Sequence, residues 1–230
     1  DRWWEARKIW GAIVNDSRSL VLQLQAFLKN ETKDEVVKKI AYRQIAWCYS
    51  LGQSLRGLPP LENCGELLSD KDRKDLEIIK NKPLGILQLN VEDISTMRKQ
   101  QSLSEFEHVQ LNSTCVRFSD SMGAAERINS TVFPTTYRMF LHFTIYLFIA
   151  ILSIGLKGVM LVYEIPLLLL IATVFFMLEK TAYHLQDPFK NRPSDISVTA
   201  IARTIEINLR QLIKEENVPE PITKDEFYIM

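Results

Sequence analysis

The chain has 230 residues, of which 47% are hydrophobic, and its 28 basic residues balance its 28 acidic ones. Acids and bases alternate in runs such as SDKDRKDLEIIKNK, so the sequence offers no basic surface for nucleic acid. A mean hydropathy near zero is typical of a soluble domain, but this average hides one long apolar stretch between charged flanks.

Two amphipathic helices are predicted at the start of the chain, at residues 1–28 and at about 33–55. Apolar residues recur in the first at helical spacing, with charges between them: Trp3, Trp10, Ile13, Leu20 and Leu24. Tryptophans suit either a packed core or a membrane interface, and the pattern leaves both open. The second helix carries its own apolar stripe and ends before Gly57 and the Pro59–Pro60 pair, which stop a helix.

Three more helices are predicted at residues 70–79, 85–99 and 102–125, with a turn at Lys82–Gly85. No sustained alternation of apolar and polar residues occurs between hairpin turns, which argues against strands. Residues 1–136 are therefore expected to form an all-helical cytoplasmic region.

Residues 137–186 read as a membrane-spanning helical hairpin. Met139 to Leu156 carries no formal charge, and a helix of this length rises about 27 Å, close to one hydrocarbon thickness. The second apolar stretch, VMLVYEIPLLLLIATVFFML, contains Pro166, which suits a first helical turn. We expect this helix from about Ile165, with residues 157–164 as the turn. A buried hairpin in a soluble core is the alternative, but nearly uncharged runs of this length are uncommon there.

Basic residues predict the orientation of the hairpin. The turn holds only Lys157 beside Glu164, whereas five basic residues flank the open ends: Arg127, Arg138, Lys180, Lys190 and Arg192. Because positive residues concentrate on the cytoplasmic side, both ends of the chain are expected to be cytoplasmic.

Residues 187–230 are predicted to form a loop, an amphipathic helix and a tail. Ser194 or Asp195 can cap this helix, whose apolar stripe is Val198, Ile201, Ile205, Leu209 and Leu212. The last residues are acidic and contain prolines, so we expect an extended tail. The chain begins without Met or a signal peptide, so a processed or truncated start is expected.

The sequence shows no sign of a metal site, a cofactor or an enzyme. Its three cysteines, Cys48, Cys64 and Cys115, are widely spaced and have no histidine nearby, which favours neither a disulfide framework nor zinc. The three histidines do not have metalloprotease spacing, and neither a glycine-rich phosphate loop nor a GxSxG elbow occurs.

Three blocks of sequence resemble the prokaryotic branch of the bestrophin family and occur in the family's order: RWWEARKIWGAIVNDSR, ERINSTVFPTTYRMFLH and DPFKNRPSDISVTAIARTIEINLRQL. The resemblance implies an ion channel with four membrane helices per subunit, a pentamer around one axial pore and a helical cytoplasmic vestibule. It places the segment Arg2–Glu5 directly after the helix that lines the hydrophobic neck. Two upstream membrane helices and the neck are therefore expected to be missing from this chain.

The resemblance also implies a cytoplasmic aperture ringed by one side chain from each subunit. Counting back from Glu126 and Arg127 places Phe106 at this position, where a ring of phenylalanines could impede hydrated ions by dewetting. A core position for Phe106 is the alternative. Ser102, Val109 and Ser113 lie on the same expected helix face and are candidates for lining the vestibule.

Three other polar groups are weighed as candidate sites. Animal bestrophins hold calcium in an acidic run after the equivalent of Asp187, but here Asp195 lies among cations, so no calcium clasp is expected. Asp187 and Asp195 are instead expected to bond helix ends or a neighbouring subunit. His142 is an ionisable candidate at membrane depth, or an imidazole bonded to a helix carbonyl. Glu164 is expected to cap the second membrane helix rather than to form an acidic ring.

Two functions remain. The first is a subunit of a homopentameric channel in the bacterial inner membrane that passes small monovalent ions, with chloride favoured over cations. The second is a non-conducting membrane scaffold or regulatory module that acts through its helical cytoplasmic portion. The expected partners are the lipid bilayer, inorganic monovalent ions and further copies of the chain.

Overall fold

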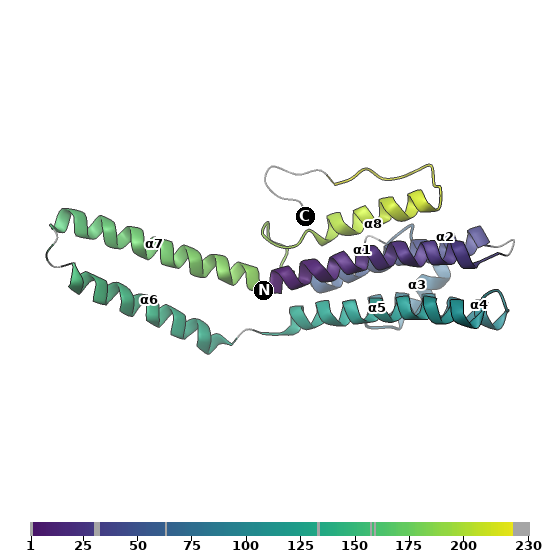
Figure 1. The fold of residues 1–230 in the computed structure, drawn as a ribbon, viewed down its shortest axis with the longest axis horizontal. Coiled ribbons are helices and arrows are strands. Elements are labelled where there is room, and N and C mark those ends of the chain that lie inside the picture. Colours follow the sequence, from purple (N-terminus) through teal and green to yellow (C-terminus); the bar gives the residue numbers. More distant parts are fainter. Residues whose placement is uncertain are drawn as a thin grey trace.

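The computed structural model describes residues 2–29, 33–62, 64–132, 134–156, 158 and 160–222, apart from the side chain of Leu161. Within this part of the chain every regular element is helical: α1 Arg2–Phe27, α2 Lys33–Leu55, α3 Asp70–Glu77, α4 Lys82–Lys99, α5 Glu105–Ser130, α6 Thr135–Gly155, α7 Leu161–Gln186 and α8 Val198–Leu212. Helices α1–α5 and α8 pack together into what we call the helical body, and the α6–α7 hairpin projects from one end of it (Figure 1). The all-α prediction is confirmed.

Helix α2 forms the centre of the helical body. Every residue from Arg43 to Gln53 is buried, because α1, α4, α5 and α8 all pack against this helix. Trp47 lies fully buried against Phe118 of α5, with ring centroids 5.2 Å apart. The sequence predicted a single apolar stripe on this helix, but its polar residues are enclosed as well.

The three tryptophans of α1 differ in burial. Trp10 is fully buried in the core, whereas Trp4 is exposed. Trp3 is half-buried, and its indole nitrogen donates a hydrogen bond to the Ser194 carbonyl 3.0 Å away. The start of α1 therefore contacts the loop that follows the hairpin, while its middle belongs to the core.

Several helix boundaries in the body differ from the prediction, including the end of α3 at Glu77 rather than 79. Helix α4 begins at Lys82 rather than 85, because Asn81 caps it and Pro83 fits its first turn. Helix α5 begins at Glu105 rather than 102 and continues to Ser130 rather than 125. Ser104 and Glu107 form a capping box at its start, which satisfies the first free amides of the helix.

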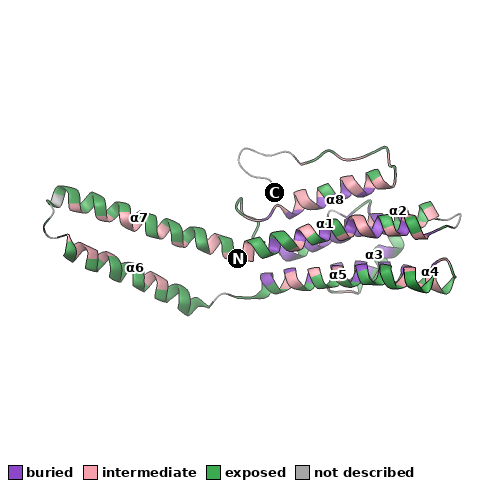
Figure 2. Cartoon of the chain, viewed as in Figure 1, coloured by how far each residue is buried: buried purple, intermediate pink, exposed green. Residues whose placement is uncertain are grey.

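The hairpin helices are mostly exposed, with some residues of intermediate burial (Figure 2). Both are long and apolar enough to cross a membrane, and Ile145 is the sole buried residue among the described positions of α6 and α7. A mostly exposed apolar hairpin is not the core of a soluble protein. The predicted hairpin is therefore present, and its surface suits a lipid environment.

Helix α7 begins earlier than predicted. Its first residue is Leu161, because the amides of Tyr163 and Glu164 already donate to the Met160 carbonyl. Pro166 thus lies inside the helix, close to an end where few backbone bonds are lost. The prediction that Glu164 caps this helix is wrong, since Met160 is the N-cap residue and the Glu164 carboxylate accepts a hydrogen bond from the Ser153 hydroxyl of α6.

Helix α8 packs against α1 and α2 through the predicted stripe, in which Val198, Ile205 and Leu209 are buried. The predicted cap is wrong, because the N-cap residue is Ser197 and its side chain makes no capping bond. Asp195 instead accepts a hydrogen bond from the Arg192 amide within the loop, and Asp187 ends α7. Residues 217–222 of the predicted tail contain no helix, and residues 223–230 lie outside the described part of the chain.

Candidate functional site

Helix α5 has two different faces. Its inner face is buried against the rest of the body through Leu111, Cys115, Phe118 and Met122. Its outer face exposes Phe106, Val109, Ser113, Val116 and Asp120. Steps of three or four residues along a helix stay on one face, so these side chains form one stripe, which we call the outer stripe. The outer stripe follows α5 from its start towards the hairpin (Figure 1).

Phe106 is held rigidly at the start of α5, yet its own side chain contacts little. It is 88% exposed, so the alternative of a core position is wrong. Leu103 is buried beneath the turn, the capping box fixes the helix start, and Glu105 pairs with Arg98 at 2.6 Å. The phenyl ring of Phe106 is therefore exposed, although these contacts hold the backbone at the start of α5.

Ser102 does not belong to the outer stripe. It lies in the turn before α5, next to Gln101, whose φ is +58°. Its amide donates to the Met97 carbonyl at 2.9 Å, and its side chain is half-buried. The expectation that Ser102 shares a helix face with Phe106 is wrong, because α5 starts after it. Val109 and Ser113 do share that face.

His142 forms a polar cluster between the two hairpin helices. Its Nε2 atom lies 3.3 Å from Oε1 of Glu179 on α7, and Nε of Arg138 lies 3.8 Å from the same oxygen. The expected partner of His142 was a helix carbonyl, but the structure places a carboxylate there. The carboxylate is 13% exposed, whereas His142 is 32% and Arg138 is 53% exposed, so only Glu179 is sheltered between α6 and α7.

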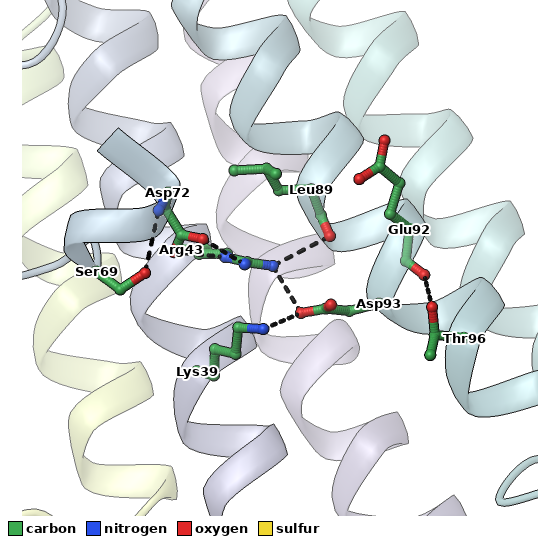
Figure 3. Close-up of polar contacts among 8 residues, drawn as sticks. All are labelled: Lys39, Arg43, Ser69, Asp72, Leu89, Glu92, Asp93 and Thr96. Carbon is green, nitrogen blue, oxygen red and sulfur yellow. Dashed lines mark hydrogen bonds and ion pairs between the residues drawn. The ribbon is translucent and has the colours of Figure 1, made fainter. Parts of the chain in front are cut away.

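A second polar cluster lies inside the helical body (Figure 3). Arg43 of α2 donates to both carboxylate oxygens of Asp72 at 2.6 and 2.9 Å, and to Asp93 of α4 at 2.7 Å. Lys39 pairs with Asp93 at 2.8 Å. Burial alone would raise the pKa of Asp72, but the hydrogen bonds and charge of Arg43 outweigh it and hold that pKa below its usual value. The cluster fastens α3 and α4 to α2.

Nothing in the sequence indicated the Arg43 cluster, because its members lie far apart in the chain and each falls in an ordinary amphipathic pattern. The three cysteines are free and buried, and burial raises the pKa values of Cys48 and Cys64 to about 12 and that of Cys115 to about 11. Among the described residues no group of three His, Cys, Asp or Glu side chains is placed to hold a metal ion.

Comparison with known proteins gives a consistent picture. The model of the family described as "Bacterial/Fungal Bestrophin protein" matches residues 1–211. The "Voltage-dependent anion channel-forming protein YneE" of Escherichia coli strain K12 is 33% identical over 229 residues, which cover 99% of this chain and 74% of that protein. A protein of the same description from Ralstonia nicotianae, RSc3414, is 25% identical over 218 residues, covering 95% of this chain and 71% of that protein.

Solved structures agree with the sequence comparisons. A bestrophin homologue from Klebsiella pneumoniae superimposes with a TM-score of 0.87 and 26% identity, covering 94% of this chain and 80% of that one. A point variant of a bestrophin homologue from the same organism gives a TM-score of 0.86 at 26% identity, covering 93% of this chain and 79% of that one. The chain therefore belongs to the bacterial and fungal bestrophin family of membrane proteins.

Proposed function

We propose that this chain is one subunit of a ring-shaped, homopentameric channel that passes small monovalent ions, with chloride preferred over cations. The related proteins that are named as anion channel-forming support ion passage and favour anions. In this proposal the hairpin lies in the bacterial inner membrane, and both ends of the chain face the cytoplasm.

The outer stripe of α5 is the single observation that carries the proposal. Phe106, Val109 and Val116 are exposed on the outer face of α5 and so contribute little to packing within the body. Their exposure is explained if other copies of the chain cover them or if they line a pathway. Copies of the chain arranged around an axis would bring these stripes together along a shared pathway. Five Phe106 rings would then form an apolar constriction of the kind that gates by dewetting.

The position of Phe106 suits an aperture at the far end of a vestibule. From Phe106 to the end of α5 at Ser130 the helix rises about 36 Å, and the hairpin begins just beyond that end. Val109 and Ser113 would line the passage between the aperture and the membrane. His142 lies in the hairpin and not on the outer stripe. We propose that it serves there as a polar group paired with Glu179.

Planar-bilayer recording from the purified full-length protein tests the proposal. In asymmetric KCl the reversal potential should move towards the equilibrium potential of chloride, and native mass spectrometry should give five copies. A reversal towards the potassium potential would assign the pathway to cations. A folded oligomer that carries no current would instead support the non-conducting scaffold.

A further inference from the structure

Two cavities adjoin each other on the hairpin. The first, of 580 Å³, lies at the base of the hairpin, where α6, α7 and the linkers to the helical body meet. The second, of 390 Å³, lies between α6 and α7. Leu141, Glu179 and Ala182 line both, so the two cavities form one continuous groove. We call it the hairpin groove.

The inner half of the hairpin groove is apolar, and the whole groove is about one leaflet long. Ile145 and Phe148 of α6 face Phe175 and Leu178 of α7 across it. Along α6, the distance from Arg138 at the base to Phe148 is about 15 Å. This equals half of the roughly 30 Å hydrocarbon core of a bilayer. The groove therefore has the length of one acyl chain layer, on the side of the membrane that carries the helical body.

The mouth of the hairpin groove is cationic and aromatic. Arg138, Lys190 and Tyr183 of α7 line it. The guanidinium groups of Arg138 and Arg192 lie 4.8 and 5.7 Å from the centre of the Tyr183 ring. Clustered basic side chains beside interfacial tyrosines are the usual surroundings of anionic lipid headgroups.

The acidic groups at the mouth are already partnered. Asp187 lies 3.9 Å from Arg2, and Glu179 is shared between Arg138 and His142. By contrast, Lys190 is exposed without an ion pair among the described residues. An anionic oxygen placed beside its ammonium group would therefore gain a charge-assisted hydrogen bond.

We infer that the hairpin groove is a binding site for one anionic phospholipid of the adjacent leaflet. The phosphate contacts Lys190 and Arg138 at the mouth, and one acyl chain lies between α6 and α7 beside Ile145 and Phe148. A zwitterionic lipid would match the apolar groove but not its cationic mouth, and a free phosphate would match the mouth but leave the groove empty. This site does not depend on the proposed ion pathway.

Thermal unfolding of delipidated full-length protein in detergent tests the inference. Phosphatidylglycerol should raise the melting temperature more than phosphatidylcholine, and glycerol phosphate should have little effect. Replacing Lys190 by Gln should lower the apparent affinity for phosphatidylglycerol about fivefold, because one cation at the mouth is removed. Lys180→Gln removes a similarly exposed lysine of α7 outside the groove and should change nothing.

A second variant separates the acyl chain from the headgroup. Ala182 is exposed and lines both cavities, so Ala182→Trp should fill their junction without disturbing a packed core. It should abolish the preference for phosphatidylglycerol while leaving the melting temperature without lipid unchanged. Equal effects of the two lipids, an equal effect of glycerol phosphate, or full lipid response in Ala182→Trp would each overturn the lipid assignment.

Discussion

At the scale of single residues, Phe106 combines a fixed backbone with an unused side chain. Its helix start is held by the Ser104–Glu107 capping box and the Arg98–Glu105 pair, yet the ring is 88% exposed. A side chain that stabilises only the fold would be covered by its own chain. Phe106 is therefore a residue whose replacement should affect function more than stability.

Phe106→Ala should raise single-channel conductance, because a ring of alanines leaves a wider opening and a weaker barrier to hydrated ions. Its melting temperature should stay within about 2 °C of the original, since little packing is lost. Ile78→Ala is the matched control, because Ile78 is also 88% exposed but lies at the end of α3. Unchanged conductance together with a lower melting temperature would show that Phe106 serves packing between subunits.

Asp120 is the acidic member of the outer stripe and lies two heptads from Phe106. If the stripe lines the pathway, five copies make an acidic ring that attracts cations and opposes anions. Asp120→Asn should therefore shift the reversal potential further towards that of chloride. Asp75→Asn, which removes an exposed carboxylate of α3, should leave it unchanged. The same shift in both variants would mean a general surface-charge effect and no lining role for Asp120.

At the scale of elements, the Arg43 cluster determines how α3 and α4 are held. Arg43 and Asp72 are each 4% exposed, so their pair lies in a region where an unpaired charge is costly. Helix α4 leads into the turn that precedes α5 and Phe106, and the cluster thus supports the outer stripe from within. The Arg43 cluster therefore positions α3 and α4 relative to α2.

Asp72→Asn should lower the free energy of unfolding by about 2 kcal/mol at neutral pH, because Arg43 loses its two charged hydrogen bonds. The folded pKa of Asp72 is lowered, so its stabilisation is complete above the unfolded pKa of about 4 and disappears as the pH falls through the folded pKa. The gap between the original protein and Asp72→Asn should therefore close below about pH 4. Chemical unfolding measured across pH checks this, with Asp75→Asn as control, and a constant gap would contradict it.

Helical periodicity predicted the elements well, because most helices of the body bury one side and both hairpin helices are mainly apolar. Several ends were wrong where local bonding decides them. The capping box at Ser104 was visible as Ser-Glu-Phe-Glu and would have moved the start of α5 away from Ser102. At α7, the backbone hydrogen bonds to the Met160 carbonyl start the helix before Pro166. The preference of proline for a first helical turn did not reveal this earlier start.

The candidate site could be predicted only in part. The exposure of Phe106 follows from the orientation of α5, which depends on how α1 and α4 pack against it. The partners of His142 and Arg43 come from helices distant in sequence, and a single sequence without these contacts does not pair them. The hairpin groove likewise depends on how two helices lie side by side, so composition alone does not indicate it.

At the scale of the whole molecule, the helical body and the hairpin meet at a small joint centred on Arg2. Its guanidinium donates to the Thr131 carbonyl at 2.6 Å and to the Gln186 carbonyl at 3.3 Å, so it connects the start of α1 to both arms of the hairpin. The Trp3 indole bonds to the following loop at Ser194. Any movement of the helical body relative to the hairpin must therefore change these contacts.

Arg2→Gln should loosen the joint without unfolding either part, because Gln reaches fewer acceptors and loses the charge near Asp187. Linker residues 131, 132 and 134 should then be cleaved faster by a protease, by several-fold at fixed protease concentration. Arg7→Gln removes an exposed arginine from the same helix and should leave the cleavage rate unchanged. In bilayers, Arg2→Gln should alter open probability and preserve the reversal potential, since the joint lies away from the outer stripe. A changed reversal potential would place Arg2 on the ion pathway instead.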